Sequence, residues 1–167
     1  MRGKEIPVGN WQLDPYHTQV EFSAKHLGMM TVRGYFDEVS TKADIDPEHP
    51  EAASVEASIS TASIRTNNGM RDNDLRSSNF LEVEKYPVIT FKSTSVEPAG
   101  TDRFTLTGDL TIKGNTRPVT LDVTKYGEFN DDMMGHRIAY GAQTQINRHD
   151  YGLTANMILD GRMVVIE

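Results

Sequence analysis

Phe104-Thr-Leu-Thr-Gly-Asp-Leu-Thr-Ile112 is the stretch that decides the fold, because every second residue in it is apolar or glycine. This period of two is that of a β-strand with one buried face, since successive side chains of a strand point to opposite sides. The same alternation recurs in the runs 17–26, 53–61, 119–123 and 138–146. The chain is therefore predicted to be built mainly from strands.

Turn signals separate these runs, among them Asp46-Pro-Glu-His-Pro50, Pro98-Ala-Gly100 and Lys113-Gly-Asn115. From the alternation rule we predict about eight strands joined by short turns. Consecutive hairpins with one apolar face imply antiparallel pairing. Eight such strands either stack as a sandwich or close into a barrel, and closure removes the exposed edges.

One segment between two alternating runs does not alternate, and there we predict a helical insertion around residues 70–82. Asp72 and Asp74 can cap a short helix, and Leu75 and Phe80 give it an apolar side. A proline after this segment ends the helix, because the residue before a proline is pushed out of the helical region. A helix that crosses from one strand to the next suggests a lid or plug on a β structure.

Composition excludes several classes of function. The 167 residues include no cysteine, so disulfides, thiolate chemistry and cysteine metal sites are excluded. The net charge of −7, without a cluster of Lys and Arg, argues against nucleic acid as a partner. The sequence contains no apolar run long enough for a membrane span and no secretory signal, so we expect a cytoplasmic protein without an integral membrane segment.

Small residues recur at the predicted inward positions: Ala24, Ala57, Gly108, Ala142 and Thr144. An eight-stranded barrel is just wide enough to be filled by side chains or to hold one small ligand. Small residues on the inner face favour a ligand cavity, but they are also needed where two sheets approach closely. Alternation alone therefore leaves a cavity and a packed core as equal alternatives.

Residues that could carry out chemistry are sparse. The five histidines show neither the i, i+4 spacing of a helical metal site nor the i, i+2 spacing of a strand, and a Gly-x-Ser-x-Gly elbow is absent. We therefore predict no catalytic residues and no metal site. His26 points inward by its register. It is either a hydrogen-bonded core residue or a functional residue. Arg148 either pairs with a carboxylate at the barrel rim or receives a ligand headgroup.

Four blocks of sequence resemble the YceI family, the polyisoprenoid-binding proteins with a lipocalin-like barrel. The first runs from Trp11 to His26 and continues at 32–36, and the third covers 106–119. The second contains Arg71-Asp72 and Lys85-Tyr-Pro-Val-Ile-Thr-Phe-Lys-Ser93, and the fourth is Ile146-Asn-Arg-His-Asp-Tyr-Gly152. Together they span nearly the whole chain in the expected order.

The resemblance implies an all-β fold, an eight-stranded antiparallel lipocalin-like barrel, formed by a single domain over residues 1–167. In the family its long apolar pore takes an isoprenoid chain or a similar lipid, such as a long-chain amide. The chain departs from the family at Asp74, where many relatives carry histidine in an Arg-Asp-x-His-Leu motif. Many relatives also begin with a secretion signal. This sequence shows no such signal, so a cytoplasmic branch of the family is expected here.

The resemblance implies non-enzymatic binding, storage or transport of a long apolar ligand: a polyisoprenoid, an isoprenoid quinone or a related lipid. No cofactor is expected beyond this bound lipid. The alternative is an enzyme or stress-response protein that acts on a lipid-like substrate, for which His26, Arg71, Asp72 and Arg148 are the available polar groups. A third alternative is an interaction module with a solid core.

The expected ligand-binding residues combine strand positions that share an inward register, two apolar residues of the helical insertion and three polar candidates. They are Val20, Phe22, Ala24, His26, Phe36, Val55, Ala57, Ile59, Arg71, Leu75, Phe80, Phe91, Leu106, Leu110, Leu121, Ala142 and Arg148. The last strand, 157–166, is apolar on both faces, which suggests that it is covered on both sides. Either the inserted helix or a second copy of the chain could supply that cover. One short helix is too small to shield several strand faces, so a two-fold homodimer is favoured.

Overall fold

The computed structural model describes residues 9–26, 29–46, 48–155 and 162–166 and places eleven strands in one sheet. The strands are β1 (Gly9–Gln12), β2 (Val20–His26), β3 (Met30–Phe36), β4 (Val39–Ile45), β5 (Ser54–Ser60), β6 (Ile64–Arg65), β7 (Val88–Pro98), β8 (Arg103–Ile112), β9 (Asn115–Asp131), β10 (Gly135–Asn147) and β11 (Arg162–Ile166). The helices are α1 (Gly69–Arg76) and three short 3₁₀ turns, η1 (Pro50–Ala52), η2 (Thr61–Ser63) and η3 (Arg148–Tyr151).

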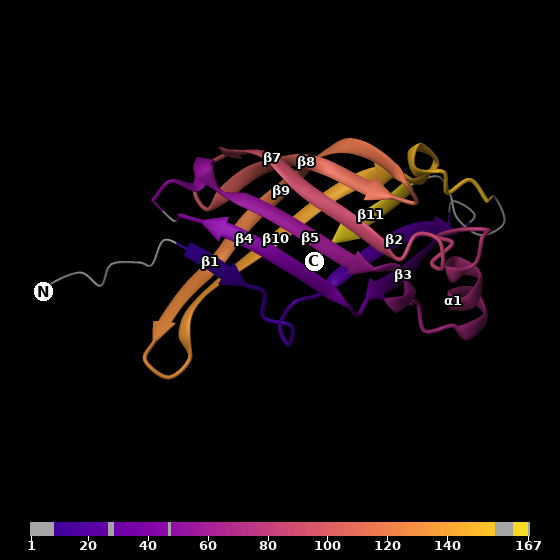
Figure 1. The fold of residues 1–167 in the computed structure, drawn as a ribbon, viewed down its shortest axis with the longest axis horizontal. Helices are drawn as coiled ribbons and strands as arrows, with labels where there is room; N and C mark the ends of the chain where they lie inside the picture. The colour runs from indigo at the N-terminus through magenta and orange to yellow at the C-terminus, as the bar shows by residue number, and fades with distance from the viewer. Residues whose placement is uncertain (1–8, 27–28, 47, 156–161, 167) are drawn as a thin grey trace, which may run out of the picture.

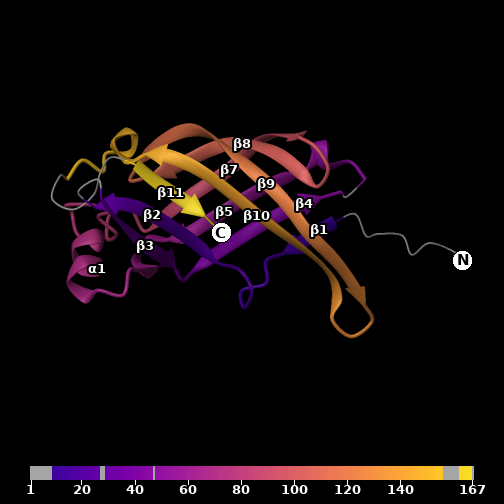
Figure 2. The same ribbon diagram turned by 180° about the vertical axis from the view of Figure 1, so that it is seen from behind.

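The sheet is antiparallel throughout and curls on itself in the order β1-β4-β5-β7-β8-β9-β10-β11-β2-β3-β6 (Figures 1 and 2). This confirms the predicted all-β antiparallel barrel-like fold with one helical insertion. The strand count exceeds the predicted eight. Among the additions are β1, with four residues, and β6, with two, which are too short for alternation to reveal them.

Two irregularities in strand register bend the sheet. The pairing of β7 with β8 shifts between Ser93 and Ser95, and the pairing of β9 with β10 shifts between Ala139 and Tyr140. An extra residue on one strand of a pair kinks that strand and increases its twist. Beyond the second shift the β9–β10 hairpin projects from the body of the sheet (Figure 1).

Helix α1 covers one end of the curled sheet (Figures 1 and 2) and is shorter than the predicted 70–82. Its N-cap is Asn68, whose side-chain oxygen accepts a hydrogen bond from the Arg71 backbone N–H at 3.1 Å. After Arg76 the chain turns back along the helix, where the Leu81 N–H donates to the Leu75 carbonyl at 2.9 Å. In the described part of the chain, no helix has the length and apolar character needed to cross a bilayer.

Candidate functional site

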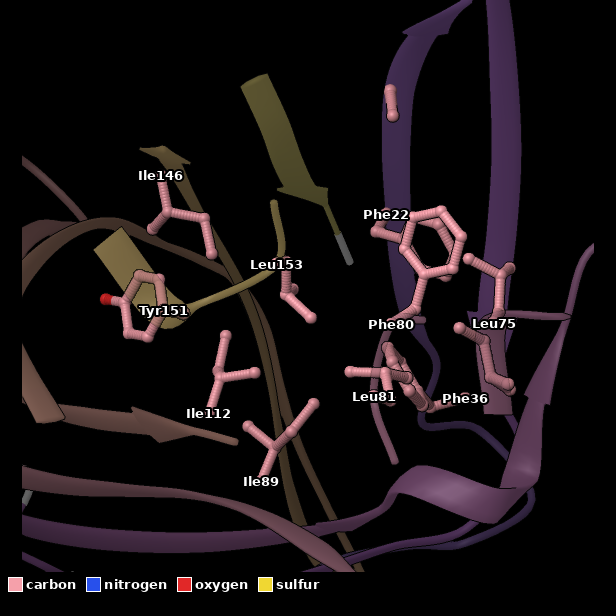
Figure 3. Packing of buried hydrophobic residues seen from close by; sticks show 12 residues of the cluster. Phe22, Phe36, Leu75, Phe80, Leu81, Ile89, Ile112, Ile146, Tyr151 and Leu153 are labelled. Carbon is pink, nitrogen blue, oxygen red and sulfur yellow. The ribbon is translucent and has the colours of Figure 1, made fainter. Parts of the chain in front are cut away.

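At the end that α1 covers, the inner face of the sheet is filled with packed side chains (Figure 3). The members of this cluster are each only 2–8% exposed: Phe22, Ala24, Phe36, Ile64, Leu75, Phe80, Leu81, Ile89, Ile112, Ile146, Tyr151 and Leu153. The gap that remains between them has a volume of about 20 Å³ and an apolar lining apart from Arg148. Such a gap has room for about one water molecule. We call these twelve residues the base.

Beyond the base the same inner face continues along the strands, where Phe91 and Leu106 are still buried and other apolar residues form a half-buried wall. Alternation carries the inner face from Ile146 to Ala142 on β10 and from Ile89 to Phe91 on β7. The half-buried members of this wall are Val55, Ala57, Val96, Leu121, Val123 and Ala142. Their register turns them inward, and each keeps part of its exposure. We call these six residues the wall.

Small residues on the inner face have two different origins. A Cβ placed on Gly108 would overlap the Phe91 ring and lie 2.5 Å from the Lys92 carbonyl oxygen. Gly34 likewise lies beneath the Phe22 ring, so each of these glycines makes room for an aromatic side chain. Ala57 and Ala142, by contrast, remain half-buried. The two glycines therefore make room for aromatic rings, whereas these two alanines keep part of their exposure.

Arg148 is 2% exposed and reaches into the base from η3. Its Nη1 donates to the carbonyl oxygens of Leu153 at 2.7 Å and Ala155 at 2.8 Å. The guanidinium also borders the 20 Å³ gap. A buried guanidinium needs hydrogen-bond acceptors to offset its lost hydration. In this structure Arg148 ties the chain after η3 to the base.

Arg71 and Asp72 hold α1 against the segment that follows β6. The Asp72 carboxylate is buried and accepts from the Thr66 backbone N–H at 2.9 Å and from the Thr66 hydroxyl at 2.5 Å. Arg71 donates from Nε to Thr66 Oγ1 at 2.7 Å and from Nη2 to the Thr66 carbonyl at 3.0 Å. Asp72 is thus a packing anchor for the helix, whereas the sequence suggested a helix cap.

At the opposite end, a polar cluster lies on the inner face of the β9–β10 hairpin. Glu128 accepts from Lys125 Nζ at 2.7 Å through one oxygen, and its other oxygen lies 2.5 Å from His136 Nε2. The Trp11 ring, from β1, meets the His136 ring edge to face at a centroid distance of 4.9 Å. Tyr140 belongs to the same face, since it pairs with Lys125 across the two strands.

Hydrogen bonds and burial set the charges of this cluster. The pKa of the Glu128 carboxyl lies below its ordinary value because Lys125 and His136 both hydrogen-bond to it. The bond to Glu128 in turn raises the pKa of the Lys125 ammonium. Burial raises the pKa of the Tyr140 phenol. Glu128 and Lys125 are therefore a charged pair, and Tyr140 is a neutral phenol, in the neutral pH range.

The residues predicted from register fall on one continuous inner surface. Phe22, Ala24, Phe36, Leu75 and Phe80 belong to the base, Phe91 and Leu106 are also buried, and Val20, Ile59 and Leu110 pack against the base or its neighbours. Val55, Ala57, Leu121 and Ala142 are in the wall. Arg148 borders the base, while Arg71 lies outside it beside Thr66. The His26 side chain lies outside the described residues.

Sequence reasoning missed the polar cluster and part of the base. Trp11, Lys125, Glu128, His136 and Tyr140 gave no signal as a set, because they come from three strands and Lys125 and Glu128 differ by an odd number of positions. Ile64, Leu81, Tyr151 and Leu153 lie in short or irregular segments, where alternation gives no register. Within the described residues, no group of three or more His, Cys, Asp or Glu side chains could hold a metal ion.

Fold and site together define a barrel-like β protein with an apolar interior, closed at one end and edged by polar groups at the other. The sequence matches the YceI-like domain over residues 11–167, and the chain belongs to this family. It is 38% identical over 141 residues to protein YceI of Salmonella arizonae, covering 84% of this chain and 73% of that protein. A UPF0312 protein of Ectopseudomonas mendocina is 36% identical over 141 residues, covering 84% and 74% of the two chains.

Solved structures share this architecture. BcnA of Burkholderia cenocepacia superposes with a TM-score of 0.83 at 22% identity, over 92% of this chain and 95% of that one. The YCEI protein of Campylobacter jejuni gives 0.69 at 29% identity, over 94% and 97%. A domain from Saccharophagus degradans, described as polyisoprenoid-binding, gives 0.64 at 16% identity, over 96% and 95%. At such low identity, the first and third comparisons establish the fold alone.

Proposed function

We propose that this protein binds a long apolar ligand along its inner face, without catalysing a reaction, and so stores or transports it. The ligand class is a polyisoprenoid, an isoprenoid quinone or a related lipid. The observation that carries the proposal is the continuous apolar inner surface that is packed at the base and half-buried along the wall. Family membership and the polyisoprenoid-binding description of a structural neighbour support the same class.

The energetics favour a chain-like ligand. Each methylene group removed from water contributes about 0.8 kcal/mol, so a long isoprenoid or acyl chain gains affinity with every unit laid along the wall. The wall residues are aliphatic and offer no side-chain hydrogen bonds, so the length and shape of the tail set its selectivity. The packed base limits how far the tail can reach toward α1.

Native mass spectrometry of the purified protein tests the proposal. We expect a co-purifying lipid, and we expect added isoprenoid quinone to bind when the protein has been stripped of lipid. Ala57→Trp places a large ring on the wall and should block binding. The matched control is Glu56→Gln, an exposed position on the same strand whose side chain meets Lys92 at 3.7 Å in solvent. A folded Ala57→Trp protein that binds as well as the control would overturn the proposal.

We also infer that the protein forms a two-fold homodimer. In the sheet β11 lies between β10 and β2, so one of its faces points outward from the barrel. The sequence of this strand is apolar on both faces, and the outward one needs cover. The side chains of this strand lie outside the described residues, so its sequence carries the inference. Sedimentation equilibrium at micromolar concentration is expected to give twice the chain mass of 18.7 kDa, and a monomer mass would contradict it.

The location in the cell stays a prediction. We propose cytoplasmic residence, and fractionation of cells that express the tagged protein tests it. Recovery with the periplasmic or secreted fraction would contradict it.

A further inference from the structure

One nitrogen of the polar cluster, Nδ1 of His136, is buried without a hydrogen-bond partner among the described residues. The His136 side chain is 11% exposed, and its Nε2 is engaged with Glu128 at 2.5 Å. Within the part of the chain that the structure describes, the buried Nδ1 of His136 has no hydrogen-bond partner. A buried polar atom without a partner costs stability, so such an atom in a native protein calls for an explanation.

The position of His136 connects this atom to the apolar interior. Residues 136, 138, 140 and 142 alternate inward along β10, so His136 lies on the same face as Ala142 of the wall. The hairpin that carries it projects away from the end that α1 closes (Figure 1). A ligand whose tail lies along the wall therefore has its head directed toward His136 or toward the base, and the base is full.

The hydrogen bond to Glu128 assigns the proton of the neutral imidazole. The Glu128 carboxylate is ionised and can only accept, so Nε2 must carry the proton that it shares with Glu128. In the neutral ring this assignment leaves Nδ1 as a bare acceptor. The ligand group that satisfies an acceptor is a donor, such as the O–H of an alcohol or a quinol.

The charges of the cluster argue against an anionic head. Lys125 is already paired with Glu128 at 2.7 Å, so the two charges compensate each other. A phosphate or diphosphate beside His136 would be placed next to the Glu128 carboxylate, in a protein of net charge −7. A neutral hydroxyl suffers no such repulsion.

The Trp11 ring lies against the imidazole and belongs to a short strand at the edge of the sheet. Strand β1 has four residues and pairs within the sheet with β4 alone, and the indole Nε1 donates to the Ile45 carbonyl at 3.1 Å. Because Nδ1 is buried and the indole lies against the same ring, we expect a ligand that reaches Nδ1 to move Trp11. Trp11 is the single tryptophan of the chain, so its emission reports directly on this site.

We propose that His136 Nδ1 accepts a hydrogen bond from a hydroxyl on the head of an isoprenoid ligand, beneath Trp11. This inference rests on the proposed function, because the wall must hold the tail. It assigns the ligand class as a long isoprenoid alcohol or quinol, in preference to the corresponding ether or diphosphate.

Competition between matched probes tests this assignment. Equimolar geranylgeraniol and geranylgeranyl methyl ether are offered to the full-length protein, and their occupancies are compared by native mass spectrometry. We expect the alcohol to be preferred about fivefold, the effect of one hydrogen bond to an otherwise unpaired buried group. His136→Phe should reduce the preference to about onefold, and His136→Gln, which keeps an acceptor, should retain part of it. His149→Phe, at an exposed position in η3, is the control that should keep it in full.

The outcomes separate the head site from the proposed function. Equal binding of alcohol and ether to the natural protein, or a preference that survives in His136→Phe, overturns the head site and leaves tail binding standing. Preference for geranylgeranyl diphosphate over the alcohol also overturns it. Failure of every probe to bind overturns the proposed function. Should His136→Phe not fold, long-range ¹H–¹⁵N correlations of the natural protein decide: a protonated Nδ1, or one unmoved by geranylgeraniol, refutes the proposal.

Discussion

The two ends of the inner face are built from similar residues and differ in what they pack against. At the base, side chains from strands, α1 and the segment after η3 converge and exclude solvent (Figure 3). Along the wall, strand residues of the same register stay half-buried. An apolar inward residue therefore means stability at one end and binding capacity at the other, and variants at matched positions can separate the two roles.

The largest contrast is expected from truncating one residue of each region. Phe22 is 2% exposed and packs against Phe36 at a ring-centroid distance of 5.5 Å. Phe22→Ala should lower the free energy of unfolding by about 3–5 kcal/mol, because it removes a large buried ring and leaves a cavity. Leu121→Ala in the half-buried wall should cost about 1 kcal/mol, since part of that side chain is already in water. Urea unfolding of both variants measures the difference, and equal costs would contradict the division into base and wall.

A smaller loss is expected where α1 is anchored over the base. Asp72→Ala leaves the buried Thr66 N–H and hydroxyl without their acceptor, which should cost about 2–3 kcal/mol. The control on the same helix is Asp74→Ala. Asp74 is half-buried and its side chain accepts from Asn79 at 3.0 Å, so the cost should stay below about 1 kcal/mol. Thermal unfolding compares the pair, and a larger loss from the Asp74 variant would refute the anchor.

Alanine substitution of two glycines on neighbouring strands compares a packed position with an open one. Gly108→Ala forces a methyl group into the Phe91 ring and the Lys92 carbonyl, and should cost about 1–3 kcal/mol. Gly127→Ala, on the projecting hairpin, meets nothing within 4 Å of the new Cβ and should change stability by less than about 0.5 kcal/mol. Chemical denaturation distinguishes them, and a neutral Gly108→Ala would show that the Phe91 ring and the Lys92 carbonyl both shift without cost.

The smallest effect on stability is expected from the solvent-exposed hydrogen bond between Asp14 and His17. The pKa of the Asp14 carboxyl is lowered from 3.8 to about 2, first by its hydrogen bond with His17 and further by the Tyr16 N–H and Arg137. A carboxyl with a lowered folded-state pKa stabilises the protein above pH 3.8, and this contribution is lost as the pH falls toward 2.

Carboxyl ¹³C titration measures the Asp14 midpoint directly. His17→Ala should raise it toward 3.8, because the largest cause of the shift is removed. His49→Ala, whose imidazole lies beside Glu51, should leave it in place. An Asp14 titration midpoint near 3.8 in the natural protein would show that the hydrogen bond between Asp14 and His17 does not persist in solution.

The sequence predicted much of the architecture and part of the site, for reasons that individual residues show. Period-two runs place Phe22, Ala57, Phe91 and Leu121 on one face, and the structure has them there, because register in a sheet follows directly from the backbone. The N-cap Asn68 was missed, since several polar residues near 70 could have capped the helix.

By itself the sequence determined the strand alternation, the position of the helical insertion and the family, since each depends on local spacing or on matched residues. The tertiary structure decided which inward residues are packed and which are half-buried, because that depends on what lies across the curled sheet. The tertiary structure also decided which polar side chains come together in the polar cluster. Lys125 and Glu128 are three positions apart, so a regular strand would place them on opposite faces. The register shift beside Tyr140 adds a residue to β9 and brings both side chains to His136 on the inner face.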